Sequence, residues 1–343
     1  MHDVLVAGGG PAGLAVAVGA ARAGLDVVVC EKRHGIIDKA CGEGLMPGAV
    51  HALHQLGIDP PGHDITGITY RQGGDGGDVV ATAEFRHGPG RGVRRTVLHE
   101  AMRAATHALG VVIRPGPVTE VQQYPDHVEA AGVRARYLVA ADGLHSRIRS
   151  AVGLSMLDDS APRWGLRRHF ALPPTSDQVE VTWSERAEAY VTPISDDSIG
   201  VAILSSTRGG FDDLLAAFPA LAARLRRAEA VSDVRGAGPL RQRTRGRVRG
   251  RVLLVGDAAG YVDALTGEGL ALGLVTAAEV VSCITANRPD RYERAWTRLS
   301  RRSRWITEGL LWTRQHAATS NRIVPLAARA PRLFAAAVDQ LAG

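Results

Sequence analysis

The sequence contains very little lysine. Of its 41 basic residues only Lys32 and Lys39 are lysines, and the remainder are arginines, which gives a formal net charge of +6. The basic residues are not interleaved with aromatic ones in a stripe, and no zinc-finger or helix-turn-helix spacing is present. We therefore interpret the arginine excess as a coding bias and expect no nucleic-acid partner.

Cysteine and long apolar runs are also scarce. The three cysteines, Cys30, Cys41 and Cys283, show no paired spacing, which is typical of a reducing cytosol. No run reaches the roughly 18 apolar residues of a membrane span. The first expected strand starts at residue 3, so we expect no signal peptide. Together these absences favour a cytoplasmic protein, and we expect no metal site.

A glycine-rich turn between two apolar strands begins the chain. The run over 4–7 predicts a buried parallel strand. The turn that follows, Gly8-Gly9-Gly10-Pro11-Ala12-Gly13, fits G-x-G-x-x-G, and a small-residue helix is expected over 14–23. A second strand over 26–30 then delivers Glu31. This order of strand, turn, helix, strand and acid predicts a dinucleotide site.

Each residue of this motif has a mechanical reason. Gly8 allows the tight turn, Gly10 lets the backbone approach a pyrophosphate, and Gly13 lets helix and strand pack closely. The helix N-terminus offers free N–H groups to the phosphates. Glu31 can accept hydrogen bonds from both hydroxyls of an adenosine ribose, which argues against a 2′-phosphate and leaves FAD or NAD.

Two further strand–loop–helix units follow. In the first, a strand over 137–141 ends in Asp142-Gly143. In the second, a strand over 252–255 ends in Gly256-Asp257, and Gly267-Glu268-Gly269 leads into a helix over 270–286. FAD explains these units better than NAD does. Its ribityl hydroxyls need an acceptor such as Asp257, and a reduced flavin ring is stabilised by a helix N-terminus such as 266–270.

The remaining segments predict a second structural unit and a helical tail. Three strand-like stretches over 164–205 predict an antiparallel sheet, and 65–88 adds short strands around a glycine-rich turn at 73–77. Helices are expected over 94–109, 211–227 and most of 289–343.

Three motifs together resemble those of the para-hydroxybenzoate hydroxylase-like flavoproteins. They are the Gly-rich turn, the stretch AADGLHSRIR over 140–149 and the stretch GDAAGYVDALTGEG over 256–269. That superfamily includes aromatic hydroxylases, geranylgeranyl reductases and flavin halogenases. The resemblance implies an α/β fold with a glutathione-reductase-like FAD-binding Rossmann domain and an inserted antiparallel substrate sheet. We expect the FAD-binding domain over 1–64, 91–160 and 243–343, and the substrate domain over 65–90 and 161–242.

The resemblance also implies a set of FAD contacts and an NAD(P)H electron donor, which in the hydroxylases docks beside Asp142-Gly143. The expected FAD contacts are Gly8, Gly10, Pro11, Ala12, Gly13, Glu31, Lys32, Arg95, Asp142, Gly143, Asp257, Gly267, Glu268, Gly269 and Leu270.

Candidates for catalysis lie in two loops. Cys41 precedes Gly42-Glu43, and a thiol near a flavin can line the substrate cavity; the alternative is a loop cysteine packed as a small apolar group. Glu43 and Glu268 are candidate general bases, against the alternative of solvated loop acids. Substrate contacts are expected from Trp183, Tyr190 and Pro193 of the antiparallel sheet, where plain core packing is the alternative.

The leading functional interpretation is an NAD(P)H-dependent monooxygenase that hydroxylates a phenolic small molecule through a flavin C4a-hydroperoxide. The segment CGEGL over 41–45 and the segment LTGEG over 265–269 are closer to the geranylgeranyl reductases, which makes a reductase of isoprenoid or polyene double bonds the alternative. A flavin-binding protein without turnover is a third hypothesis. The Arg- and Trp-rich tail is either an interfacial helix on anionic lipid or a solvated helical face. The substrate is expected to be aromatic or lipidic, and the sequence indicates no oligomeric state.

Overall fold

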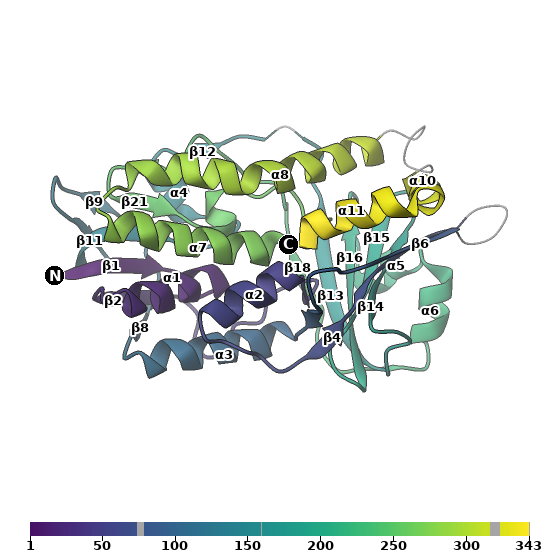
Figure 1. Ribbon diagram of the computed structural model, residues 1–343. Coiled ribbons are helices and arrows are strands. Elements are labelled where there is room, and N and C mark those ends of the chain that lie inside the picture. Colours follow the sequence, from purple (N-terminus) through teal and green to yellow (C-terminus); the bar gives the residue numbers. More distant parts are fainter. Residues whose placement is uncertain (74–78, 159, 316–322, 343) are drawn as a thin grey trace.

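The computed structural model describes residues 1–73, 79–158, 160–315 and 323–342. Two sheets lie at opposite ends of an elongated molecule, the first at the left of Figure 1 and the second at the right. The predicted turn over 73–77 falls almost wholly outside the described residues.

The first sheet is parallel over most of its width. Across the sheet its strands are β20 (Val248–Arg249), β21 (Val252–Leu254), β11 (Val133–Ala140), β1 (His2–Ala7), β2 (Val27–Glu31) and β8 (Val112–Pro115), with β10 (Val128–Ala130) and β9 (Gln122–Gln123) paired beyond β11. Every neighbouring pair from β21 to β8 is parallel. The parallel sheet predicted from the buried apolar runs is therefore confirmed.

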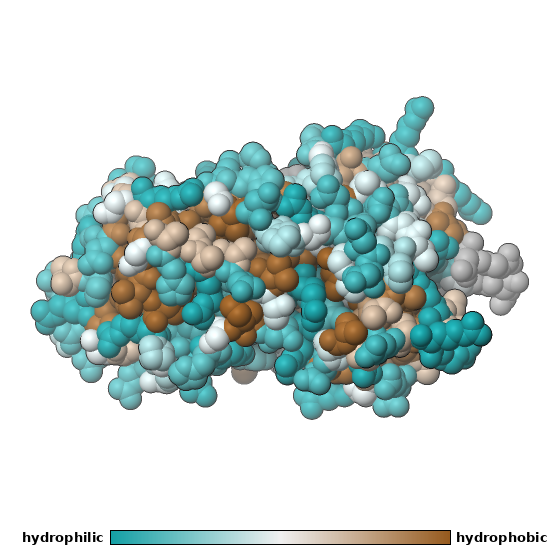
Figure 2. Space-filling view, turned by 90° about the horizontal axis from the view of Figure 1, so that it is seen from below, coloured by the Kyte–Doolittle hydropathy of each residue, from teal (hydrophilic) through white to brown (hydrophobic). Residues whose placement is uncertain are grey.

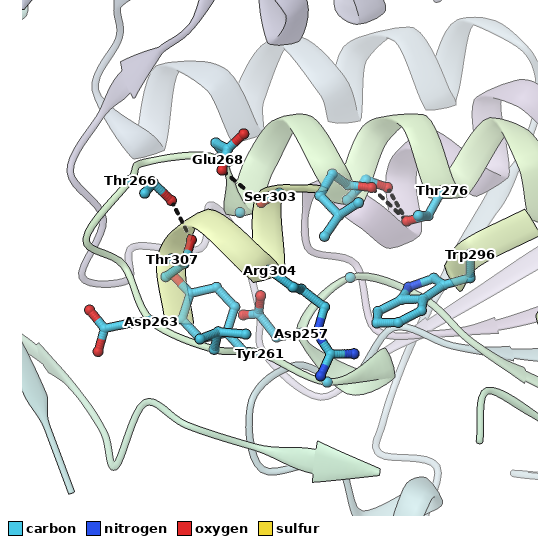
Figure 3. A pocket seen from close by; sticks show the side chains of 16 residues that line it. Asp257, Tyr261, Asp263, Thr266, Glu268, Thr276, Trp296, Ser303, Arg304 and Thr307 are labelled. Atoms are coloured by element: carbon cyan, nitrogen blue, oxygen red, sulfur yellow. Dashed lines mark hydrogen bonds between the residues drawn. The ribbon is translucent and has the colours of Figure 1, made fainter. Parts of the chain in front are cut away.

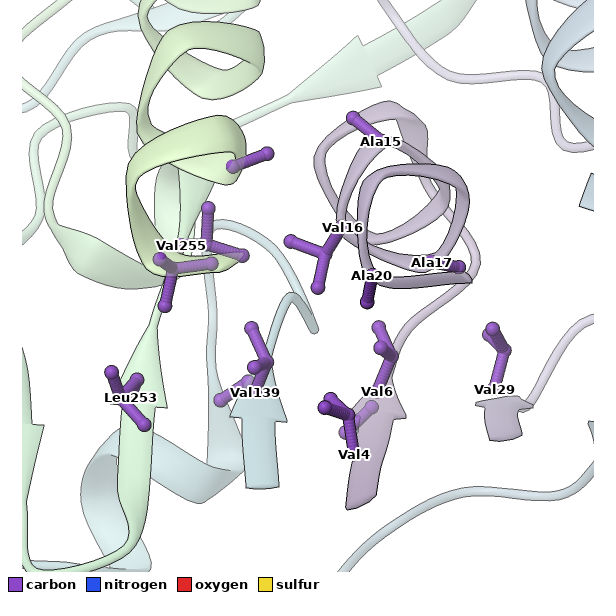
Figure 4. Close-up of a cluster of buried hydrophobic side chains, with 14 of the residues drawn as sticks. Val4, Val6, Ala15, Val16, Ala17, Ala20, Val29, Val139, Leu253 and Val255 are labelled. Carbon is purple, nitrogen blue, oxygen red and sulfur yellow. The ribbon is translucent and has the colours of Figure 1, made fainter. Parts of the chain in front are cut away.

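Small residues allow helices to lie close to this sheet. Helix α1 (Pro11–Arg22) packs on α7 (Gly269–Thr285) and on α3 (Arg95–Ala108). Val16 and Ala20 of α1 point toward Val6 and its neighbours on the sheet (Figure 4). The small side chains on this face let α1 lie close to the sheet. Its N-terminus therefore lies directly at the carboxyl end of β1.

The second sheet is the antiparallel one predicted over 164–205, extended at both edges. Its strands, in order, are β17 (Glu229–Ala230), β13 (Trp164–Ala171), β16 (Ser198–Ser205), β15 (Ala187–Pro193), β14 (Gln178–Trp183), β5 (Gly67–Gln72) and β6 (Val79–Glu84), with β18 (Arg235–Ala237) also paired to β13. The pairs are antiparallel except for β14 with β5, which run parallel. Alternate residues of β14 are buried, as expected for a sheet with one covered face.

Two small sheets and two short helices complete the connections. The three-stranded sheet contains β3 (Gly44–Leu45), β7 (Gly90–Gly92) and β4 (His63–Ile65), and the two-stranded sheet contains β12 (Ser155–Met156) and β19 (Arg243–Thr244). The helices are α4 (Arg147–Ala151) and the 3₁₀ helix η1 (Gly256–Ala259). A Cβ at Gly92 would lie 1.6 Å from the carbonyl oxygen of Pro193. The backbone of β7 therefore lies directly against the end of β15.

The prediction of one continuous helix over 211–227 is wrong. The structure has two helices there, α5 (Phe211–Leu215) and α6 (Pro219–Leu225). Pro219 lacks an N–H group and occupies the first turn of α6, where that group has no intrahelical acceptor. The helix predicted over 94–109 corresponds to α3, and the short helix α2 (Pro47–Gln55) precedes it in the chain.

The C-terminal helices divide between the two sheets. Helix α8 (Asp290–Gln315) packs on α7, whereas α10 (Ile323–Arg329) and α11 (Pro331–Ala342) pack on β6 of the second sheet. The rings of Phe334 and Tyr70 are 5.4 Å apart, and Asp339 accepts a hydrogen bond from the backbone of Arg86. This packing differs from the expected boundary, which placed all of 243–343 with the FAD-binding domain.

Apolar side chains are unevenly exposed on the face seen from below. They gather over the parallel-sheet half and near the centre of the molecule, between polar margins (Figure 2). Helix α8 lies on the opposite side, at the top of Figure 1.

Candidate functional site

The turn after β1 is built so closely that it accepts only glycine at two positions. Gly8 has a φ of +110°, and a Cβ there would lie 2.4 Å from the carbonyl oxygen of Ala141. A Cβ at Gly13 would lie 1.9 Å from the carbonyl oxygen of Gly8. These are the tight turn and the close packing of helix and strand that the motif predicts.

Gly10 leaves an open space between the N-terminus of α1 and a buried arginine. Apart from its chain neighbours, the one described atom within 4 Å of a Cβ at Gly10 is Nη2 of Arg95, at 4.0 Å. Gly10 is the N-cap of α1 and forms no side-chain cap, so the first N–H groups of the helix are left for a ligand. This space suits a phosphate group.

Arg95 is a buried cation without an anionic partner. It is only 7% exposed, and among the described residues its Nε has no hydrogen-bond partner and no ion pair joins it. Burial lowers the pKa of Arg95, opposed by Cys41, Asp257 and Glu43 nearby. A guanidinium held in this way next to a helix N-terminus favours a bound phosphate.

Glu31 and His99 hold the glycine turn in place. The Glu31 carboxylate accepts a hydrogen bond from the Gly9 backbone at 2.6 Å and another from the Arg33 backbone at 2.9 Å. His99 Nδ1 accepts from the Ile37 backbone at 3.1 Å, so the proton is on Nε2, which lies 2.8 Å from the carbonyl oxygen of Gly9. Burial lowers the pKa of His99, which keeps the ring neutral. Sequence reasoning missed His99, although it falls on the buried face of α3.

Gly8, Gly10, Glu31 and Arg95 line a cavity of about 340 Å³. Of the expected FAD contacts it contains Gly8, Gly10, Glu31, Lys32, Arg95 and Asp142, and it adds Lys39, Pro117, Val118 and His145, which sequence reasoning did not identify. Nothing in the sequence near 117 signals a cofactor contact, because this loop reaches the cavity only through the pairing of β8 with β2.

Asp142 and Lys39 supply polar groups to the same cavity. One carboxylate oxygen of Asp142 accepts a hydrogen bond from the Ile148 backbone at 3.2 Å, and the other, Oδ1, is buried with no partner among the described residues. The Lys39 Nζ lies 3.1 Å from where a Gly143 Cβ would be. Burial lowers the pKa of Lys39, and the positive charge of Arg33 acts in the same direction.

The third motif lines a smaller pocket of about 40 Å³ beside α8 (Figure 3). It contains Asp257, Glu268 and Gly269, whereas Gly267 and Leu270 are not among its lining residues. Burial raises the pKa of Asp257, opposed by Lys39, Arg95 and Arg149. Asp257 therefore lies within electrostatic reach of the larger cavity as well.

Two hydrogen bonds fix this loop to α8. Glu268 accepts from the Ser303 hydroxyl at 2.6 Å, and the hydroxyl oxygens of Thr266 and Thr307 are 3.1 Å apart (Figure 3). Burial raises the pKa of Glu268. The N-terminus of α7 begins directly after Glu268, with no side-chain cap.

Glu43 differs from the solvated loop acid considered above. It is only 2% exposed and has a φ of +61°. One oxygen accepts from the Arg95 backbone at 2.8 Å, and the other lies 2.6 Å from His169 Nε2. Since both oxygens are engaged, the structure does not present Glu43 as a free base.

Cys41 lies next to this pair and is half-buried. Its sulfur accepts a hydrogen bond from the Glu43 backbone at 3.4 Å. Burial raises the pKa of the Cys41 thiol. The loop is also anchored to the second sheet, because the Thr192 hydroxyl donates to the carbonyl oxygen of Gly42 at 2.8 Å. The thiol is therefore held at a fixed place between the two sheets.

The expected substrate contacts lie on the second sheet, near the third motif. The Tyr190 hydroxyl donates to the carbonyl oxygen of Leu265 at 2.9 Å. Trp183 is 5% exposed and belongs to a core cluster with Leu265 and Leu311, so it is packed in the interior. Pro193 lies at the end of β15 against Gly92, as described above.

The cavity residues fit FAD. The glycine turn leaves room for a pyrophosphate, Arg95 lacks the anion it needs, and the unpartnered oxygen of Asp142 can accept from a sugar hydroxyl. The cavity joins Glu31, the expected ribose acceptor, to Asp142 across the carboxyl ends of β2, β1 and β11, where ligands of such sheets bind.

Known proteins with similar sequences and structures agree with this fit. Menaquinone reductase of Mycolicibacterium smegmatis is 30% identical over 87% of this chain and 80% of its own length. Digeranylgeranylglycerophospholipid reductase 1 of Methanothermobacter thermautotrophicus is 29% identical over 85% and 81%. 3-Hydroxybenzoate 6-hydroxylase 1 of Aquipseudomonas alcaligenes is 31% identical over 48% and 45%.

The solved structure of CmlS, a flavin-dependent halogenase, matches with a TM-score of 0.79 at 21% identity, over 91% of this chain and 64% of that one, which shows a shared fold. The profile of the FAD binding domain family matches residues 1–287. The chain therefore belongs to the FAD binding domain family and is an FAD-dependent oxidoreductase.

Proposed function

We propose that this protein is a reductase that saturates a carbon–carbon double bond of an isoprenoid lipid, with NAD(P)H as the electron donor. This reverses the order of the two leading interpretations of the sequence. The observation that carries it is the pairing of Glu43 with His169 and the Arg95 backbone, next to the Cys41 thiol, whose sulfur accepts from the Glu43 backbone. Hydroxylation of a phenol needs a base that removes the phenolic proton, and this loop offers none.

The comparisons with known proteins also favour the reductase over the phenol hydroxylase. Two relatives that each match more than four-fifths of this chain are named as reductases of a menaquinone and of a digeranylgeranylglycerophospholipid, and both of these molecules carry isoprenoid chains. The hydroxylase relative matches less than half of the chain.

We assign the expected FAD contacts to distinct parts of the cofactor. Gly10, Arg95 and the N-terminus of α1 would hold the pyrophosphate, Glu31 the adenosine ribose, and Asp142 and Asp257 the hydroxyls of the ribityl chain. FAD, when bound, supplies the two-electron redox chemistry. The N-terminus of α7 would stabilise negative charge near its first residues, Gly269 and Leu270.

In this proposal Cys41 holds a proton close to the substrate. Because burial raises the pKa of the thiol, Sγ stays protonated at neutral pH. Reduction of a double bond adds one hydride and one proton, and the Sγ–H group would supply that proton. Glu43 and Thr192 would act as positioning residues, since the Glu43 N–H donates to the Cys41 sulfur and the Thr192 hydroxyl donates to the carbonyl oxygen of Gly42.

A phenol monooxygenase is the second candidate, and one observation favours it. Burial raises the pKa of Glu268 above its ordinary value, which is the direction that suits a general base. The hydrogen bond that Glu268 accepts from Ser303 opposes this role, because it lowers the pKa of the carboxyl group. A flavin-binding protein without turnover is not proposed, because the relatives are named as enzymes.

The experiment that separates the two candidates is a turnover assay with and without oxygen. Protein reconstituted with FAD is supplied with NADH or NADPH under anaerobic conditions and offered menaquinone or a geranylgeranyl lipid in detergent. A product that gains two hydrogens without oxygen supports the reductase. If product forms only in air and carries label from heavy oxygen gas, the reductase proposal is wrong.

A further inference from the structure

Helix α8 has two faces of different character. One face contacts the protein interior through Trp296, Ser300, Ser303, Thr307, Leu311 and Arg314. The opposite face is exposed and carries Arg294, Arg298, Arg301, Arg302, Trp305 and Trp312. Both sets recur at spacings of three, four and seven residues, as the faces of one helix do.

The exposed face ends in large apolar side chains. Trp305 is 76% exposed and Trp312 is 58% exposed. On the following helices, Leu326 of α10 is 59% exposed and Leu333 of α11 is 75% exposed. Tryptophan combines apolar rings with an N–H group, which suits the boundary between water and lipid.

The charge of α8 is strongly positive. The helix contains seven arginines against three acidic residues, and each of these acids already has an arginine partner: Asp290 with Arg288, Glu293 with Arg247, and Glu308 with Arg241. In the described part of the chain, no ion pair joins the exposed Arg294, Arg298 or Arg301 to an acid. Their charge is therefore available to an external anionic surface.

We propose that the outward face of α8, together with Leu326 and Leu333, binds the surface of a membrane that contains anionic lipids. An arginine-rich polar face next to exposed tryptophan and leucine matches the charge and the apolar interior of such a surface. None of the described helices is both long enough and apolar enough to cross a bilayer, so α8 lies on the membrane and does not span it.

The inward face of α8 contacts the third motif, so membrane binding would also position the candidate active site. Ser303 and Thr307 bind the loop that contains Thr266 and Glu268, so the membrane-binding face lies only one helix diameter, about 10 Å, from the third motif. Membrane binding would therefore bring the candidate active site next to a lipid substrate. The surface itself does not depend on the reductase proposal, because it is argued from exposure and charge alone.

The test is co-sedimentation of the full-length, FAD-loaded protein with lipid vesicles. We expect binding to phosphatidylcholine vesicles that contain phosphatidylglycerol, weak binding to pure phosphatidylcholine, and loss of binding at high salt. Each of Arg298→Gln and Arg301→Gln should weaken binding about fivefold, and Trp305→Ala should weaken it further at every salt concentration.

Matched controls use exposed residues outside this face. Arg226→Gln with Arg227→Gln on the second-sheet side, and Leu157→Ala, which is 91% exposed, should bind like the parent protein. Bound FAD, measured by absorbance, should be unchanged in every variant, which keeps this test separate from the proposed enzymatic function.

Three results would overturn the proposal. They are an absence of binding to anionic vesicles at low salt, equal binding by the Trp305→Ala and parent proteins, and a light-scattering measurement in which the parent is a dimer that Trp305→Ala makes monomeric. The last would assign the face to a second copy of the chain.

Discussion

Nε2 of His169 lies 2.6 Å from a carboxylate oxygen of Glu43, and both side chains are almost fully buried. His169 belongs to β13 of the second sheet, whereas Glu43 follows the cysteine loop that leads into β3. The other Glu43 oxygen binds the backbone of Arg95 at the start of α3. One carboxylate thus joins the second sheet, the cysteine loop and the helix that supplies the cavity arginine.

Removing this carboxylate should destabilise the protein. We expect Glu43→Ala to lower the free energy of unfolding by about 3–5 kcal/mol, because it leaves buried polar groups without their partner. Glu43→Gln retains hydrogen-bonding capacity and should cost less. Urea unfolding followed by circular dichroism measures both, and the exposed Glu185→Gln is the control. A Glu43→Ala protein as stable as the control would show that the carboxylate has no structural role.

Helix α1 should tolerate a methyl group at one of its glycines and not at another. A Cβ at Gly13 meets the carbonyl oxygen of Gly8 at 1.9 Å, so Gly13→Ala should weaken FAD binding roughly 10- to 100-fold through overpacking. Gly19→Ala is the matched control, since its Cβ would lie 3.5 Å from a methyl group of Val281. It should leave FAD affinity unchanged and stabilise the helix by about 0.5–1 kcal/mol.

Flavin fluorescence titration of the apoprotein gives both dissociation constants. Equal affinities for the two alanine variants would mean that the turn does not hold the cofactor.

Replacing Arg95 should have different effects on the stability of the apoprotein and on its affinity for FAD. Arg95→Met removes a buried cation that has no anionic partner in the described part of the chain, so the apoprotein should keep or gain stability. FAD affinity should fall about 10- to 100-fold with the loss of a charged hydrogen bond to phosphate. Arg95→Lys retains the charge but not the planar fork, and should show an intermediate affinity.

Thermal unfolding with and without FAD measures this effect as a change in the stabilisation caused by the cofactor. The assignment of Arg95 to the phosphate fails if FAD stabilises the Arg95→Met variant as much as the parent.

Alkylation of Cys41 should depend steeply on pH. Burial raises the pKa of its thiol above the ordinary value of 9.0, so the reactive thiolate is scarce at neutral pH. The rate of reaction with iodoacetamide should still be rising above pH 9.0. Peptide mass spectrometry resolves Cys41 from Cys30 and Cys283, which are buried and should react more slowly.

FAD should protect Cys41 if the thiol lies beside the cofactor, where the proposed proton transfer to the substrate needs it. A reaction rate that levels off below pH 9, or one that FAD does not change, would argue against this placement.

Local sequence determined the nucleotide-binding half of the site. The valine-rich runs before Gly8 and before Glu31 form the adjacent parallel strands β1 and β2, because apolar β-branched residues suit a strand buried on both faces. The glycines at 8 and 13 lie where a side chain would strike the backbone. Such constraints act over a few residues and can therefore be predicted from spacing alone.

Tertiary structure decided which polar groups remain available for chemistry. Glu43 lies in a sequence typical of a solvated loop acid, yet its carboxylate is hydrogen-bonded to His169, 126 residues away. His99 reaches the glycine turn across 90 residues, and α10 and α11 pack on a sheet that begins near residue 67. A side chain's burial and its partners depend on contacts between distant segments, which local patterns do not encode; only the fold shows that Arg95 lacks an anion while Glu43 already has its partners.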